Sequence, residues 1–121
     1  MSENTGCGVT ACECSSAAMQ FDVFKNPNPA ARKHAPYIVD LQSEHLDHLA
    51  TRLCAPAKPA RLSVKPIAGL MPEIEVDGQA FHVYMQEIAA IPAIVLGARA
   101  ASASQYRLQF ITAVDLIVSG I

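Results

Sequence analysis

Residues 73–85, EIEVDGQAFHVYM, carry the clearest structural signal in this 121-residue sequence. Asp77 and Gly78 are the residue pair preferred in a type I′ turn, because glycine adopts a positive φ freely and aspartate tolerates one. A two-residue turn at this point sets Ile74 opposite Phe81 and places both side chains on the core face of a β-hairpin. The alternate positions are expected to face solvent: Glu73, Glu75 and His82.

Before the hairpin, three segments have the alternation or the β-branched composition that is typical of short strands: MQFDVFK (19–25), YIVDLQS (37–43) and TRLCAP (51–56). Alternation places Phe21 and Val23 in the core. The polar residues between and after such positions are expected on the wet face: Gln20, Asp22, Asp40 and Gln42. Pro56 is expected to end the third strand, because proline has no amide proton for a β-ladder.

Residues 57–72 contain three prolines and predict mostly loop, with a short edge segment at Leu62–Val64. IAAIPAIVLG (88–97) predicts a turn and then a buried strand over Ala93–Leu96, which Gly97 ends. Both segments are therefore expected to complete a sheet that is mainly antiparallel.

The last segment changes to helical spacing. Ser102 or Ser104 is expected to cap the start of the helix. An apolar stripe able to lie on a sheet follows: Leu108, Ile111, Ala113, Val114 and Ile117. The chain is therefore predicted to be mainly β, a small antiparallel sheet or barrel closed by one C-terminal α-helix.

The composition, 51% hydrophobic and 17% charged, is that of an ordinary soluble globular domain. After residue 18, nine acidic residues balance nine basic ones, because Glu3 and Glu13 account for two of the eleven acids. A balanced charge predicts no direct nucleic-acid binding, which depends on clustered Lys and Arg. No apolar run reaches the ~20 residues of a membrane span, and no secretory signal is evident, so cytoplasmic localisation is expected.

Residues 1–18 are small and polar without periodicity, and we expect a flexible extension ahead of a single domain over 19–121. The extension holds Cys7, Cys12 and Cys14. Zinc or redox chemistry there is the less favoured interpretation, because neither a C-x-x-C spacing nor a fourth ligand is present.

No catalytic constellation is evident, and neither a cofactor nor a metal is expected. His45 and His48, with Asp47 between them, have the spacing of metal ligands but also suit a solvated turn. A small-barrel ribonuclease would need a basic groove, for which the candidates are Arg32, Lys33 and Arg52. The balanced charge argues against such a groove.

The chain closes with VDLIVSGI (114–121), in which Asp115 is the one charged side chain. Gly120 is expected to end the helix, as glycine commonly does past a C-terminus. Ile121 then projects as an uncovered apolar group. Simple fraying and a surface for a partner protein are the two interpretations.

Several segments in order resemble the CcdB toxin family: MQFDVF (19–24), VDLQSEHLD (39–47), LMPEIEVDGQAF (70–81), IAAIPAIVLG (88–97) and AVDLIVSGI (113–121). The resemblance covers residues 19–121. It implies a small SH3-like barrel, of the CcdB and MazF type, with a C-terminal helix, in a homodimer. It also implies the non-enzymatic toxin of a type II toxin–antitoxin pair, either plasmid-borne, as in plasmid maintenance, or chromosomal.

Toxins of this family bind the A subunit of DNA gyrase and trap it on cleaved DNA, and a CcdA-like antitoxin releases them. By this resemblance the gyrase contact falls on the last three residues: Ser119, Gly120 and Ile121. Antitoxin contacts fall on three further positions: Ser43, Leu46 and Asp115.

The chain departs from the family pattern at four places. Ser119 stands where the pattern has tryptophan, and Val118 where it has an aromatic residue. Asp115 replaces an amide, and His45 replaces an aliphatic residue. Two alternatives therefore stay open: a weakened or inactive homologue that binds antitoxin for operon autoregulation, and an endoribonuclease of the related barrel toxins.

Overall fold

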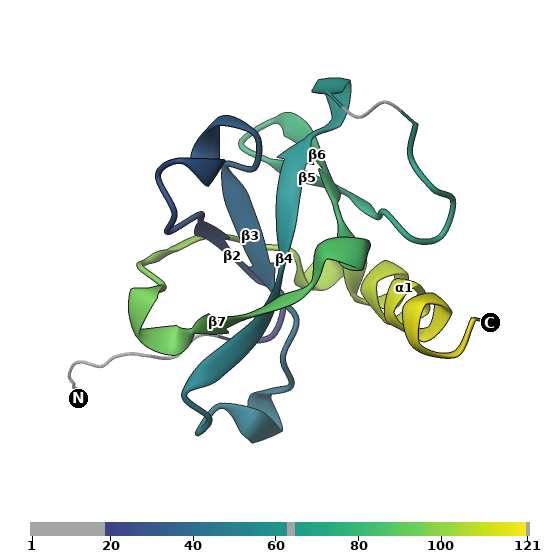
Figure 1. Ribbon diagram of the computed structural model, residues 1–121. Helices are drawn as coiled ribbons and strands as arrows, with labels where there is room; N and C mark the ends of the chain where they lie inside the picture. The colour runs from purple at the N-terminus through teal and green to yellow at the C-terminus, as the bar shows by residue number, and fades with distance from the viewer. Residues whose placement is uncertain (1–18, 63–64, 121) are drawn as a thin grey trace.

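The computed structural model describes residues 19–62 and 65–120. The predicted extension and Ile121 lie outside the described residues, so a boundary at residue 18 stays a prediction. Seven strands form one curled antiparallel sheet, a half-barrel, and a helix follows them (Figure 1). The elements are β2 (Asp22–Lys25), β3 (Tyr37–Asp40), β4 (Thr51–Pro59), β5 (Glu73–Val76), β6 (Gln79–Val83), β7 (Ala89–Pro92), β8 (Arg99–Ser102) and α1 (Arg107–Ser119).

The strand order is β5-β6-β4-β3-β2-β8, with β7 paired to the first half of β4. Single turns of 3-10 helix connect the strands: η1 (Ala31–Lys33), η2 (Glu44–Leu46), η3 (Ala60–Leu62), η4 (Met85–Glu87), η5 (Ala93–Val95) and η6 (Ser104–Tyr106). The predicted mainly β fold with a C-terminal helix is confirmed. Among the described helices, none has the length and apolar character needed to cross a membrane.

The β5–β6 hairpin has the predicted turn and register. Asp77 and Gly78 both adopt positive φ, 53° and 78°, and Ile74 pairs with Phe81. Ile74 and Phe81 are almost fully buried. The expected exposure of His82 is wrong, because β6 lies between β5 and β4 and its neighbours cover the ring. His82 Nε2 lies 3.4 Å from a Glu73 carboxylate oxygen.

The third strand runs past Pro56, contrary to the prediction. β4 changes its neighbour at this point, since residues 51–54 pair with β7 and residues 57–59 pair with β6. Proline fits at the changeover, where a missing amide donor interrupts neither ladder. The Pro56 carbonyl still accepts a hydrogen bond from the Tyr84 amide, at 2.8 Å.

Two other strand predictions differ from the structure, the first of them at the one residue that the structure describes. Leu62 belongs to η3 rather than to an edge strand, and residues 63–64 lie outside the described residues. The segment Ala93–Leu96 is not a buried strand, because η5 occupies it and leaves Ile94 92% exposed. Pairing begins four residues earlier, in β7, and β8 was not predicted because its sequence RAAS has no apolar alternation.

Apolar side chains pack on both faces of the sheet. The main cluster lies under α1, where the rings of Phe21 and Phe110 stack with their centroids 5.1 Å apart. A second cluster on the other face contains Phe24, Ile38 and Cys54. Because both faces are covered, the polar positions expected in water are buried instead: Asp22, Asp40 and Gln42.

α1 confirms the predicted helix but not its cap or its whole stripe. Its N-terminus has no side-chain cap, and Ser102 accepts a hydrogen bond from the amide of Ser104 instead. Phe110 and Ala113 face the core, whereas Leu108 is 75% exposed. The helix is therefore rotated relative to the predicted stripe.

Candidate functional site

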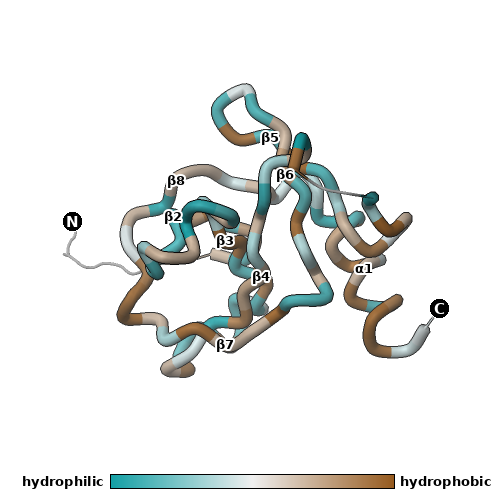
Figure 2. Tube along the Cα trace, turned by 45° about the horizontal axis from the view of Figure 1, so that its top comes forward, coloured by the Kyte–Doolittle hydropathy of each residue, from teal (hydrophilic) through white to brown (hydrophobic). Residues whose placement is uncertain are grey.

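The last turns of α1 extend beyond the sheet (Figure 1). Ile117 lies four residues after Ala113 and seven after Phe110, so it continues the inward-facing row of the helix. It is nevertheless 41% exposed, and Val118 is 79% exposed. Figure 2 shows that hydrophobic residues continue along this end of α1. Ile117 thus has the inward position that helical spacing predicts, but it is only partly covered, and an apolar surface is open at the helix end.

Gly120 ends the helix as predicted. It adopts a left-handed conformation with φ 71°, and its amide donates to the Leu116 carbonyl at 3.0 Å. A Cβ at this position would meet no atom within 4 Å, so the backbone angle rather than space favours glycine. Ser119 donates its hydroxyl to the carbonyl of Asp115, at 2.9 Å. Of the three predicted gyrase contacts, Ser119 and Gly120 are exposed at this end, and Ile121 lies outside the described residues.

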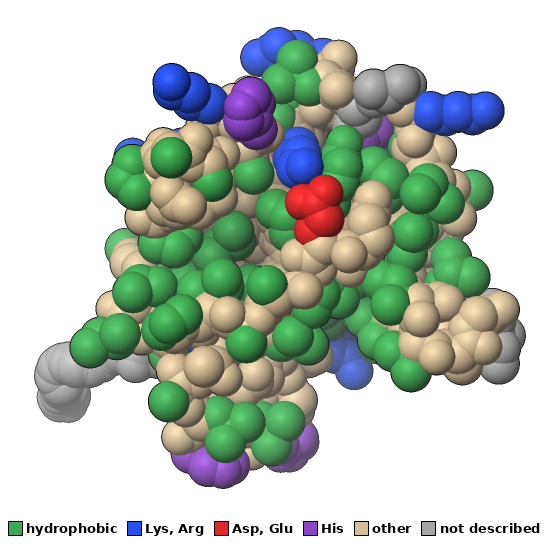
Figure 3. Space-filling model, viewed as in Figure 1, with side chains coloured by type: hydrophobic (Ala, Val, Ile, Leu, Met, Phe, Trp, Pro, Cys, Tyr) green, Lys and Arg blue, Asp and Glu red, His purple; other side chains and the backbone are tan. Residues whose placement is uncertain are grey.

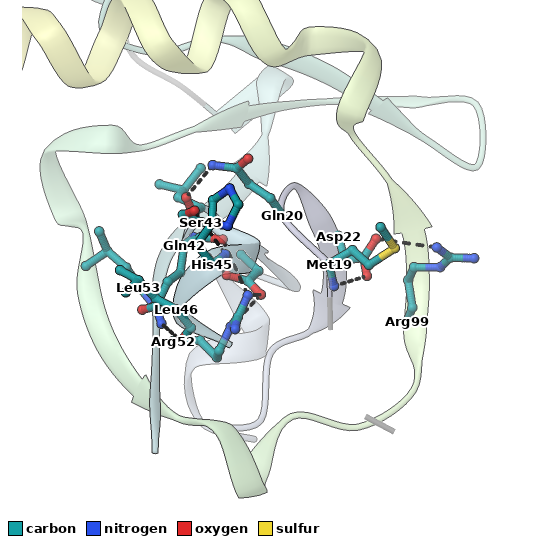
Figure 4. Close-up of polar contacts among 12 residues, drawn as sticks. Met19, Gln20, Asp22, Gln42, Ser43, His45, Leu46, Arg52, Leu53 and Arg99 are labelled. Atoms are coloured by element: carbon teal, nitrogen blue, oxygen red, sulfur yellow. Dashed lines mark hydrogen bonds and ion pairs between the residues drawn. The ribbon is translucent and has the colours of Figure 1, made fainter. Parts of the chain in front are cut away.

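A second exposed segment is the turn after β3. Ser43 caps η2 by accepting a hydrogen bond from the His45 amide, at 3.2 Å. The side chain of Leu46 is 44% exposed. The Gln42 side chain joins the turn to β4: its Nε2 donates to the Leu46 carbonyl at 2.8 Å, and its Oε1 accepts from the Leu53 amide (Figure 4).

A buried ion pair anchors this turn to the sheet. Arg52 Nε donates to Asp40 Oδ2 at 2.9 Å, and Arg52 Nη2 donates to the Gln42 carbonyl at 3.4 Å. The other Asp40 oxygen accepts from the Gln42 amide at 3.0 Å. Burial raises the pKa of Asp40 above its ordinary value, although the Gln42 amide and the Arg52 guanidinium oppose this rise. The network was missed because its residues occupy positions that alternation assigns to solvent.

The turn and the helix are linked through Gln20. Gln20 donates to the Leu41 carbonyl at 3.2 Å and accepts from Arg107 of α1 at 3.3 Å. A shallow hollow of about 160 Å³ lies here, lined in part by Leu41 and Asp115. Asp115 thus lies beside the chain segment that leads into the turn. Among the hydrogen bonds of the described residues, none joins Asp115 to Ser43 or Leu46.

The other chemical candidates are not brought together. His45 and His48 lie on an exposed turn, and the described residues contain no group of three metal-ligating side chains. Arg52 is sealed in its ion pair, so it cannot line a substrate groove with Arg32. Cys54 is buried, and burial raises the pKa of its thiol to about 12, which suppresses the thiolate.

Fold and site together define a small half-barrel protein whose exposed apolar helix end suits contact with another protein. A comparison with protein families matches residues 20–120 to the family described as CcdB protein. The chain therefore belongs to the CcdB family, whose members are in general non-enzymatic toxins of toxin–antitoxin pairs. A comparison with curated proteins finds no match.

Proposed function

We propose that this protein is the toxin of a type II toxin–antitoxin pair and binds the A subunit of DNA gyrase in the cytoplasm. In this proposal it traps gyrase on cleaved DNA without chemistry of its own. The family supports a toxin, and the uncovered helix end, with Ile117 41% and Val118 79% exposed, supports a protein contact there. The contact would include Ser119, Gly120 and Ile121.

A homodimer fits this mode of action. A twofold axis would bring two helix ends together and match a twofold axis in the target. The capped end of α1 presents its apolar side chains on a fixed scaffold, because the Gly120 amide closes the last turn. Fixed presentation lowers the entropy lost on binding.

A CcdA-like antitoxin would bind the face formed by the turn after β3 and by Asp115. Ser43 and Leu46 lie on the turn that the Gln42 network holds in place. The tail of such an antitoxin would fold as it binds, and its surface would overlap the gyrase contact. Displacement of gyrase by antitoxin follows from this overlap.

The decisive experiment is capture of purified gyrase A subunit by the full chain, together with growth arrest on regulated expression. Deletion of Gly120 and Ile121 is expected to abolish both, and Val118→Ser is expected to weaken capture. Leu62→Ser is the matched control, because Leu62 is also an exposed aliphatic residue, 51% accessible, away from α1. Equal capture and equal arrest by the deletion and the intact chain would refute the proposal.

Ser119 supports one second candidate function. The family pattern has its main aromatic anchor here, and a small exposed serine provides little apolar contact. A weakened toxin retained for antitoxin binding and operon autoregulation would bind its antitoxin tightly. It would capture no gyrase A subunit in the same assay, which distinguishes it from the first candidate.

A further inference from the structure

Basic side chains gather at one end of the half-barrel. Lys25 at the end of β2 pairs with Tyr37 at the start of β3, and Tyr37 pairs with Ala57 near the end of β4. The connection after β2 and the turn η3 therefore lie at the same end. They add further bases: Arg32, Lys33 and Arg61. Figure 3 shows most of the visible Lys and Arg side chains in the upper half of the molecule.

A groove of about 410 Å³ lies at this end. Lys33 lines it from η1, and Arg61 lines it from η3. The acidic residue in its lining is Asp77, in the β5–β6 turn. Two cations from separate elements thus share one open groove with a single carboxylate.

The charges of three bases at this end are not neutralised locally. Among the described residues, Lys25, Lys33 and Arg61 form no ion pair. Lys58 is different, because it lies 3.3 Å from Glu87 and over the ring of Tyr84. The three free cations therefore remain available to an external anion.

The balanced charge of the sequence conceals this patch. Asp40 is fully buried against Arg52, and Asp22 is buried 3.5 Å from Arg99. These two carboxylates lie toward the opposite ends of β3 and β2 from Lys25 and Tyr37. Acidic residues that are paired in the fold do little to reduce the potential at the basic end.

The groove favours phosphates over a peptide. Its apolar lining is mostly covered, because Val76 and Phe81 are each only 2% exposed. Leu62, 51% exposed, is the one large apolar side chain of the lining that is open to solvent, so the groove offers a peptide a single apolar contact rather than a pocket. The accessible rim is basic at Lys33 and Arg61, which suits a repeating row of phosphates. We propose that this groove binds the phosphodiester backbone of a nucleic acid without reading its sequence, through Lys33 and Arg61.

The test is fluorescence anisotropy of the full chain with a labelled DNA duplex and, separately, a labelled single-stranded RNA. Binding is expected at low salt, and log K should fall with log salt, with a slope of about −1.8 for the duplex and about −1.4 for the single strand if two phosphates are contacted. Lys33→Gln with Arg61→Gln should weaken binding about tenfold or more at low salt and remove most of that slope. Equal binding of the two probes would indicate that the groove recognises any phosphodiester backbone. Tighter binding of one probe would identify DNA or RNA as the preferred ligand.

Arg107→Gln is the matched control, because it removes a single exposed cation on α1, away from the groove. It should leave binding within about twofold, whereas Asp77→Asn should strengthen it. Circular dichroism verifies that each variant is folded. Absence of binding at low salt, equal binding by the double variant, or binding of poly-glutamate in place of both nucleic acids would overturn the proposal.

Discussion

Arg52 and Asp40 form a buried ion pair: Arg52 Nη2 lies 2.9 Å from Asp40 Oδ2, and the side chains are 2% and 0% exposed. Asp40 also accepts a hydrogen bond from the Gln42 amide, and Arg52 donates one to the Gln42 carbonyl. The Gln42 side chain in turn bonds to the Leu46 carbonyl in the Ser43–Leu46 turn. A core ion pair therefore sets the position of a surface that is proposed to bind antitoxin. Its removal should affect both stability and that surface.

Arg52→Met is expected to lower the free energy of unfolding by about 3–5 kcal/mol, because it leaves the Asp40 carboxylate buried without its partner. Arg52→Met combined with Asp40→Leu should lose much less, since no unpaired charge remains. Chemical denaturation of the two variants measures the difference. Equal losses in the single and double variants would show that the pair is not coupled.

Cys54 gives a prediction for alkaline pH. Its folded pKa of about 12 lies above that of an unfolded thiol, so its stabilising contribution is complete below the unfolded pKa and is lost as the pH rises toward 12. Between pH 9 and 10.5, wild type should therefore lose up to about 1 kcal/mol more per pH unit than Cys54→Ala. Denaturation across this range measures the difference, and parallel curves would contradict the burial effect.

Local patterns predicted the parts of the fold that depend on local chemistry. The Asp77–Gly78 turn and the Gly120 cap each follow from a required backbone angle, and both are confirmed. Pro56 and His82 were misplaced because their surroundings depend on which strands become neighbours. Sequence alternation does not report that a curled sheet covers both faces, so the Asp40 network was also missed.

The candidate site could be predicted only in part, for a related reason. Helical spacing located α1 but did not fix its rotation, which depends on the stacking of Phe110 against Phe21 from a distant strand segment. The exposed end was expected at Ile121, but the described surface begins earlier, at Ile117 and Val118. How far the helix extends past the sheet is a tertiary property.

The rotation of α1 can be tested with a matched pair of substitutions. Phe110→Ala should lower the free energy of unfolding by about 3–5 kcal/mol, because Phe110 is 1% exposed and stacks on Phe21. Leu108→Ala should change it by less than about 0.5 kcal/mol, because Leu108 is 75% exposed. Thermal or chemical unfolding measures both. A larger loss of unfolding free energy for Leu108→Ala than for Phe110→Ala would contradict the observed rotation and favour the apolar stripe predicted from the sequence.

Ser119→Trp tests the proposed gyrase contact through an expected gain in affinity rather than a loss. A tryptophan anchor at an interface typically contributes about 2–4 kcal/mol, so affinity for the gyrase A subunit should rise roughly 30-fold or more. The hydroxyl that is removed bonds only to the Asp115 carbonyl in an exposed turn, so the helix should keep its stability. Calorimetry or surface plasmon resonance with purified A subunit measures the change.

Thr112→Trp is the control for that gain. Thr112 lies seven residues before Ser119, two turns earlier on the same exposed face of α1. The substitution therefore places a tryptophan ring on the same face but away from the helix end. If the contact is confined to the end of the helix, Thr112→Trp leaves affinity unchanged while Ser119→Trp raises it. A similar rise in both variants would indicate nonspecific adhesion, and no rise in either would place the gyrase contact elsewhere on the protein.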